Sequence, residues 1–271
     1  MKESSPSVSP NASVSLPRYL SRPDYRDISE DKLVALDAEL AGTPLDYIHD
    51  GLEAIGPDMI RALSNVKAQP VRNNLPKELS IVVDDMSRYM PTHMLAVYAR
   101  QSSATRRRVT LFPVHNIILA AHCANLPQLP ESNPSAPDVP GSSISVPVVP
   151  LCIPAPETFP HLSAFLYTKR VDHLLSSLLP CPAPPSLYRE EPMESGNPEL
   201  VQFATKLSSM YTAQALLSRA MLVNGLWRNV CALGIFDERL WGAMDVAWEV
   251  LLTAMAIATG KPQMILGTQS S

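Results

Sequence analysis

The chain has 271 residues, of which 46% are hydrophobic and 18% charged, and its formal net charge is −4 at neutral pH. This much apolar material supports one or two packed domains and excludes a chain that is disordered throughout. The weakly acidic balance provides no basic field for phosphate backbones or anionic lipid, so we expect no direct binding to nucleic acid.

Residues 1–27 are rich in serine and proline and lack the apolar core of a signal peptide, which predicts a disordered tail. Ser5 and Ser9 each precede a proline and are candidate phosphorylation sites, because a phosphate there would add about two negative charges to a flexible segment. Serine–proline pairs of this kind also occur often by chance in tails of this composition.

Residues 28–91 are expected to form short helices, since apolar residues recur at helical spacing. Pro44, Pro57 and Pro76 stand where helices would begin, and proline is tolerated there because its missing N–H costs nothing. Thr43 would cap the first of these helices. The last of them would run from about residue 79 to 90.

Residues 92–180 read as a compact core that mixes strands and helices. A strand pair is predicted around residues 94–114 and is followed by an apolar helix over 115–124. The proline-rich insert 127–150 is predicted to be a surface loop or a disordered excursion, because it cannot keep a helix or a central strand. Further predictions are a strand from Val149, a helix over 159–168 and a second helix over 171–179.

A second proline-rich connector covers residues 181–198, and residues 199–262 are predicted to be helical. Asn197 and Pro198 provide the cap and the first position of a helical run that continues toward Gly234. After that break the helical spacing resumes until Gly260. Residues 263–271 form a tail, and the whole is of the α+β class.

The four cysteines occur singly, which favours reduced thiols in a nuclear or cytoplasmic protein. The apolar run 246–258 is interrupted by Glu249 and is shorter than the roughly 20 residues that cross a bilayer, so no membrane span is expected. The tempting metal ligands lack the paired spacing of zinc sites and are assigned structural roles. They are His115, His122, Cys123, Cys152 and His161.

Two surface patterns each leave two interpretations open. Residues 106–108 are three arginines that serve either as a charge guard on a strand edge or as a minimal nuclear-import patch, and we favour the guard. The P-x-x-P spacings within the insert 127–150 suit either a plain spacer or a polyproline II ligand, and we favour the spacer. No nucleophile elbow or phosphate loop is present in the sequence, so we expect no enzyme and no cofactor.

The strand pair, the segment F-P-V-H, the helix I-I-L-A-A and the later segment F-L-Y-T resemble the BTB/POZ pattern. The resemblance implies a BTB/POZ-like core with a small sheet and surrounding helices, flanked by N- and C-terminal helices. It implies structural roles, not catalytic ones, for six residues. They are Phe112, Pro113, His115, Leu119, Phe165 and Tyr167.

The block L-F-P-V-H-N-I-I-L-A-A-H-C-A-N-L-P, with the early helices and the segment N-G-L-W-R-N-V-C-A-L-G, resembles the clampless proteins of mushroom-forming fungi. That resemblance implies a regulator of sexual development needed for clamp-cell formation and the dikaryon cell cycle. We expect protein partners, transcription regulators among them, and leave a homodimer open. The alternative that the BTB/POZ pattern implies is a substrate adaptor of a cullin ubiquitin ligase.

Overall fold

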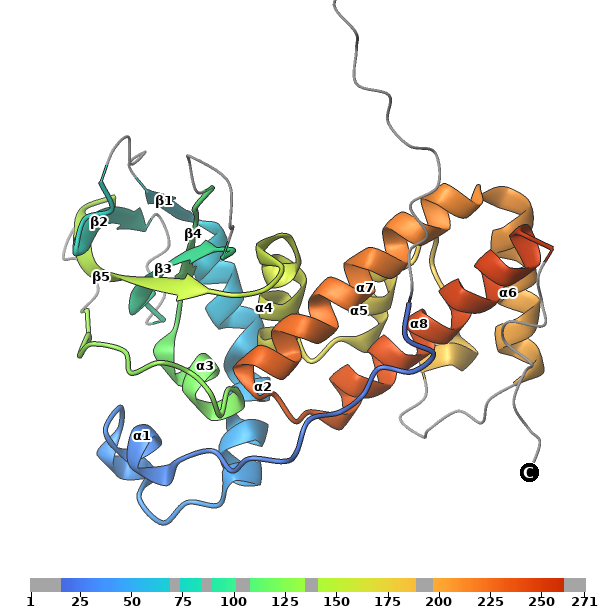
Figure 1. Cartoon of the computed structure of the whole chain (residues 1–271). Coiled ribbons are helices and arrows are strands. Elements are labelled where there is room, and N and C mark those ends of the chain that lie inside the picture. The colour runs from blue at the N-terminus through green and yellow to red at the C-terminus, as the bar shows by residue number, and fades with distance from the viewer. Residues whose placement is uncertain are drawn as a thin grey trace, which may run out of the picture.

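The computed structural model describes residues 16–68, 74–83, 89–100, 108–134, 141–188 and 197–260. The fold is α+β, as predicted, with a five-stranded sheet at one end and the C-terminal helices at the other (Figure 1). Helices α2 (Leu45–Ser64), α3 (Asn116–His122) and α4 (Phe159–Thr168) lie between the two ends (Figure 1). The helices before the sheet and within it are α1 (Glu30–Val34), η1 (Ala38–Leu40), α2 (Leu45–Ser64) and α3 (Asn116–His122).

The sheet has the order β1-β2-β5-β3-β4, and all neighbouring strands are antiparallel except β3 and β5, which are parallel. Along β3, Leu95 and Val97 face the main core while Met94 and Ala96 face a smaller apolar cluster on the opposite face. The strands are β1 (Val66–Ala68), β2 (Glu78–Val83), β3 (His93–Tyr98), β4 (Thr110–Val114) and β5 (Ser143–Cys152).

Strand β2 corrects the prediction that residues 28–91 are all helical. Leu79, Ile81 and Val83 are buried and alternate with less buried neighbours, which is the period of two of a strand. The β-branched side chains of Ile81 and Val83 fit a pleated surface, and pairing with β5 outweighs the helical spacing of the same apolar residues. The rest of that predicted helix, residues 84–88, lies outside the described residues.

Helix α2 is one helix of 20 residues where two had been predicted, and its N-cap position is Pro44 rather than Thr43. Pro57 lies inside the helix, where it removes one backbone N–H. Gly56, directly before it, is where α2 meets α4: a Cβ added there would lie 1.9 Å from the carbonyl oxygen of Tyr167. The missing side chain therefore sets the distance between the two helices.

Strand β5 is a central strand with two prolines, which corrects the prediction that residues 143–150 belong to a loop. Its first half pairs with β2 and its second half with β3. Val148 donates its N–H toward β2 and Ile153 donates toward β3, so by alternation Pro147 and Pro150 direct their nitrogens to the side that has no strand beside it. Each half thus behaves as an edge strand, where proline is tolerated.

The C-terminal end is built from helices that follow the sheet. The long helix predicted up to Gly234 is two helices, because the chain breaks at Tyr211 and the side chain of Thr212 accepts a hydrogen bond from the N–H of Ala215 to start α7. These elements are η2 (Pro156–Thr158), α4 (Phe159–Thr168), α5 (Val171–Leu178), η3 (Pro185–Tyr188), α6 (Pro198–Met210), α7 (Ala213–Leu233) and α8 (Glu238–Ala258).

Helix α8 is long and apolar enough to cross a membrane by length and composition. Most of its residues are nevertheless buried, since α6 and α7 pack along it and Trp241 and Met244 lie in the main core. Burial of this kind is what a central helix of a packed domain requires.

Residues 16–28, which we call the strap, correct the predicted tail of residues 1–27. The strap has no helix or strand, yet it runs along α8 toward α1 (Figure 1). Leu20 is 5% exposed and belongs to the main core. Ser5 and Ser9, the candidate phosphorylation sites, lie outside the described residues, as do Arg106, Arg107 and the tail 263–271.

The contact at Gly56 predicts a large difference between two similar substitutions in α2. Gly56→Ala should lower the free energy of unfolding by at least about 2 kcal/mol, because the backbone of α4 must move away. Gly51→Ala should raise it by up to about 1 kcal/mol, since nothing lies within 4 Å of that Cβ and alanine favours helix. Urea denaturation measures both, and equal effects would contradict the close contact.

Candidate interaction site

The six residues of the BTB/POZ-like motif lie where β4, α3 and α4 meet. The Phe112 ring contacts the Phe159 ring with centroids 5.1 Å apart, and Leu119 and Phe165 are each 2% exposed in the main core. The structure therefore brings these residues together as packing and hydrogen-bonding groups. Phe112 and Pro113 lie in β4, His115 at the cap position of α3, Leu119 in α3, and Phe165 and Tyr167 in α4.

His115 and Tyr167 form a closed hydrogen-bond set. The backbone N–H of His115 donates to the Tyr167 hydroxyl at 2.9 Å, and that hydroxyl lies 3.0 Å from Nδ1 of His115. Nε2 of His115 faces the carbonyl of Tyr89 at 3.4 Å, so the tautomer with the proton on Nε2 satisfies every group. Burial lowers the pKa of His115 to about 4, and burial raises the pKa of Tyr167.

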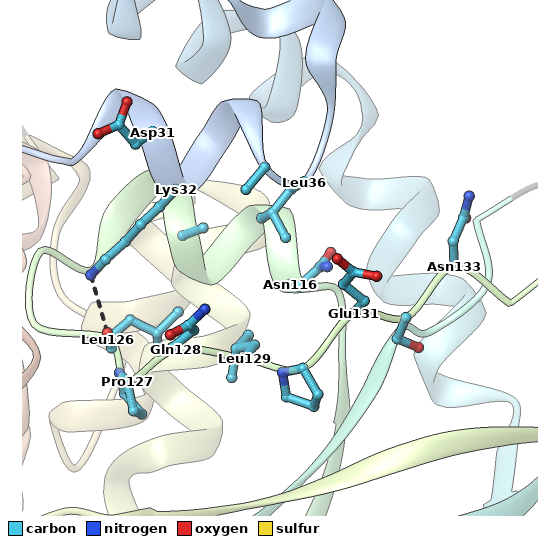
Figure 2. A pocket seen from close by; sticks show the side chains of 14 residues that line it. Asp31, Lys32, Leu36, Asn116, Leu126, Pro127, Gln128, Leu129, Glu131 and Asn133 are labelled. Carbon is cyan, nitrogen blue, oxygen red and sulfur yellow. Dashed lines mark hydrogen bonds between the residues drawn. The ribbon is translucent and has the colours of Figure 1, made fainter.

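A cleft of about 730 Å³ lies between α1, α3 and the loop of residues 126–133 (Figure 2). Ala120 of α3 and Leu36 beside α1 give it an apolar floor and wall, and Leu129 adds to them from the loop. Asp31 and Glu131 are exposed at the rim and bring negative charge to opposite walls. The cleft is the size of a ligand pocket and combines apolar surface with a few polar groups.

The loop wall of the cleft is extended and fixed. Leu126, Leu129 and Asn133 each precede a proline, which excludes the helical region for them. Nε2 of His93, a fully buried side chain, lies 2.9 Å from the carbonyl oxygen of Pro130. The ring donates its proton there and leaves Nδ1 to accept from a hydroxyl.

Two further hydrogen bonds hold the same loop at its ends. The Ser132 hydroxyl donates to the backbone carbonyl of Thr92 at 2.6 Å, and Nζ of Lys32 donates to the carbonyl of Leu126 at 3.3 Å. The Thr92 hydroxyl also lies 3.0 Å from Nδ1 of His93 and accepts the N–H of Asn116. This part of the proline-rich insert, which was predicted to be a surface loop or a disordered excursion, is thus fixed to the start of β3 and to α1.

Sequence reasoning missed the residues that build this wall. Thr92 and His93 follow Pro91 at a strand start, where a hydroxyl and an imidazole side by side are a weak signal on their own. Ser132 and Lys32 are far away in the sequence and carry no motif. Only the leucines of L-P-Q-L-P, which alternate with prolines, indicate that the loop has a side to bury.

A second cluster joins α2, α3, α4 and α8 by charge. Lys169, with a left-handed backbone (φ 51°) at the end of α4, places its ammonium 2.7 Å from Asp237, the N-cap of α8. Their side chains are 3% and 14% exposed. Burial alone would raise the pKa of Asp237, but the charge and hydrogen bond of Lys169 lower it. Next to this pair, Arg239 of α8 forms a bidentate ion pair with Glu53 of α2.

His49 and His122 stack next to this cluster with ring centroids 4.5 Å apart. Nδ1 of His122 donates to the carbonyl of Ile118 at 2.8 Å, and its buried Nε2 has no partner among the described residues. Burial lowers the pKa of His122 to about 3, with the charges of Lys169 and His49 adding to the effect. Burial likewise raises the pKa of Cys123 to about 12, so this thiol is not poised to react.

The scattered histidines and cysteines do not assemble. Within the described ranges, no three His, Cys, Asp or Glu side chains are arranged to hold a metal ion. His115 bonds to Tyr167, His122 stacks on His49, and Cys152 is exposed. The cleft itself is lined by neither histidine nor cysteine, and its ionisable side chains are those of Asp31, Lys32 and Glu131.

Fold and cleft together define an α+β protein with a helical C-terminal end and a cleft whose loop wall is fixed by hydrogen bonds. Residues 23–154 match the family model of the Clampless protein 1 N-terminal domain, and residues 172–271 match that of the Clampless protein 1 C-terminal domain. The chain belongs to the clampless protein family. Neither the curated proteins nor the solved structures give a match, so a BTB/POZ identity for the core is not confirmed.

The buried pair at α8 predicts opposite outcomes for neighbouring residues. Lys169→Met should lower the free energy of unfolding by about 3 kcal/mol or more, because it leaves Asp237 buried without a partner charge. Arg170→Ala removes only an exposed pair with Asp172 and should leave the melting temperature nearly unchanged. Thermal denaturation of both variants makes the comparison, and a stable Lys169→Met variant would show that the pair does not hold α8.

The two most shifted histidines predict an acid-sensitive fold. In the unfolded chain His115 and His122 become protonated below about pH 6.5, whereas in the folded chain their pKa values are about 4 and about 3. Between these pH values the unfolded chain binds more protons than the folded chain, so the free energy of unfolding falls as the pH falls. In His122→Gln the slope should be shallower by up to about 1.4 kcal/mol per pH unit. Urea titrations between pH 7 and 4 measure it, and an unchanged slope would contradict the neutral, buried state of His122.

Proposed function

We propose that this clampless-family chain is a non-enzymatic regulator of clamp-cell formation that acts by binding other proteins, transcription regulators among them, in the nucleus or cytoplasm. Membership of the family fits a regulator of clamp formation. The observation that carries the mechanism is the cleft between α1, α3 and the loop of residues 126–133, because its walls are fixed before any partner arrives. A preformed groove avoids the entropy cost of ordering a loop on binding.

The chemistry of the cleft selects a particular partner segment. Its apolar surface comes from Leu36, Ala120 and Leu129, which suits an aliphatic or aromatic anchor. Asp31 and Glu131 stand on opposite walls, whereas the ammonium of Lys32 already donates to the carbonyl of Leu126. The complementary ligand is therefore a short extended peptide with an apolar anchor and a lysine or arginine next to it.

Affinity purification of the tagged full chain from dikaryotic hyphae tests this proposal. We compare the wild-type chain with Glu131→Lys, which reverses a rim charge of the cleft, and with Glu39→Lys, the same change at an exposed position outside the cleft. Recovery of specific partners should fall by about tenfold with Glu131→Lys, equivalent to about 1.4 kcal/mol of binding, and stay constant with Glu39→Lys.

Two outcomes would overturn the proposal. If the wild-type chain recovers no specific protein, then protein binding is not its mode of action. If Glu131→Lys recovers the same partners as the wild-type chain while its melting curve is unchanged, then the cleft is not the binding surface. Recovery of a cullin as the main partner would replace transcription regulators by a ubiquitin ligase as the partner class.

A further inference from the structure

The strap is held against α7 and α8 by two tryptophan indoles. Nε1 of Trp248 donates to the carbonyl of Pro17 at 3.2 Å, and Nε1 of Trp227 donates to the carbonyl of Ser21 at 2.9 Å. Between these two anchors the side chain of Leu20 enters the main core. A segment with no helix or strand, bent at residues 18–19, is thus fixed at both ends of a five-residue stretch.

Arg22 adds a charged contact directly after Ser21. Its guanidinium lies 2.6 Å from a carboxylate oxygen of Glu238 and 3.5 Å from one of Asp245, both on α8. It also stands over the ring of Trp241 at 5.3 Å. All three tryptophans of the chain therefore contact the strap, and its charge complements two acidic residues of α8.

Ser21 itself is presented to solvent. Its residue is exposed, and in the described part of the chain its hydroxyl forms no hydrogen bond, since only its carbonyl is held. Arg18 stands three residues before it in the same segment, which bends at residues 18–19 and belongs to no helix or strand. Protein kinases that select arginine at this position bind their substrates as extended peptides, and the strap can take that shape without the unfolding of a helix or strand.

Two other serines of the described chain have an arginine at the same spacing, but their surroundings differ. Ser29 occupies the N-cap position of α1 and is followed by Glu30 and Asp31, which repel a kinase that selects basic residues. Ser64 lies in the last turn of α2, where its hydroxyl donates to the carbonyl of Arg61 at 2.7 Å. The fold thus separates Ser21 from the other two.

We propose that Ser21 is a phosphorylation site for an arginine-directed protein kinase and that its phosphate releases the strap from α7 and α8. In the reaction the Ser21 oxygen bonds to the γ-phosphorus of ATP, the bond from that phosphorus to the β,γ-bridging oxygen breaks, the hydroxyl proton passes to the base of the kinase, and ADP leaves. The protein itself is the substrate.

Release follows from the charges around the new phosphate. A phosphoserine carries about −1.5 to −2 charges, and its oxygens compete with Glu238 and Asp245 for the guanidinium of Arg22. The same phosphate is repelled by the two carboxylates that now lose their counter-charge. Both effects weaken the charged contact of Arg22 directly after the Ser21 anchor, and they uncover Trp227 and Trp248.

The first experiment treats the full chain with purified calmodulin-dependent protein kinase and ATP, and maps phosphate by mass spectrometry. Phosphate should appear at Ser21, and Arg18→Ala should slow its incorporation by about tenfold without slowing any other site. Arg26→Ala, which removes the equivalent arginine before Ser29, is the matched control and should leave Ser21 unaffected. Absence of phosphate from Ser21 in the wild-type chain would overturn the assignment.

The second experiment measures release through the tryptophans. The phosphorylated chain and Ser21→Glu should show red-shifted tryptophan emission and faster trypsin cleavage after Arg18 and Arg26, whereas Ser29→Glu should match the wild-type chain. Circular dichroism confirms that the helices persist in every variant. If phosphate is present at Ser21 while emission and cleavage stay at their wild-type values, the strap is not released and the switch is refuted.

Discussion

The contact on which the two ends of the molecule depend is the buried ion pair between Lys169 and Asp237. Lys169 ends α4, and Asp237 starts α8 both by capping its N-terminus and by receiving the lysine charge. A buried pair is costly to desolvate, so it persists only where its geometry and hydrogen bonds compensate. Here it fixes the entry of α8, and with it the surface on which the strap lies and the pocket wall next to His122.

The same principle of tying polar groups to distant backbone explains the cleft. A proline-rich loop cannot form regular ladders, so its carbonyls must be satisfied from elsewhere. His93 of β3 and Lys32 of α1 donate to the loop carbonyls of Pro130 and Leu126. The Ser132 hydroxyl of the loop donates in turn to the carbonyl of Thr92. The result is a fixed wall made from a segment whose composition would otherwise favour mobility.

The sequence predicted the class of the fold and most of the elements that have strong local signals. The strand pair β3–β4, the helix after His115 and the capped start at Asn197 were all readable because the signal and the structure are a few residues apart. Strand β2 could not be predicted, because its apolar residues also fit helical spacing, and only the pairing with β5 decides between a helix and a strand. The ordered strap and the cleft depend on contacts more than a hundred residues apart or on hydrogen bonds that leave no motif.

Strand β5 determines when the sheet can exist. Strands β1 and β2 form one antiparallel ribbon and β3 and β4 form another, and a two-stranded ribbon alone is only marginally stable in water. Since β5 pairs with β2 through its first half and with β3 through its second half, it is the one described strand that connects the ribbons. On the ribosome, the sheet of this protein therefore cannot close until residue 152 has left the exit tunnel, and up to that moment both ribbons have open edges that a chaperone can occupy.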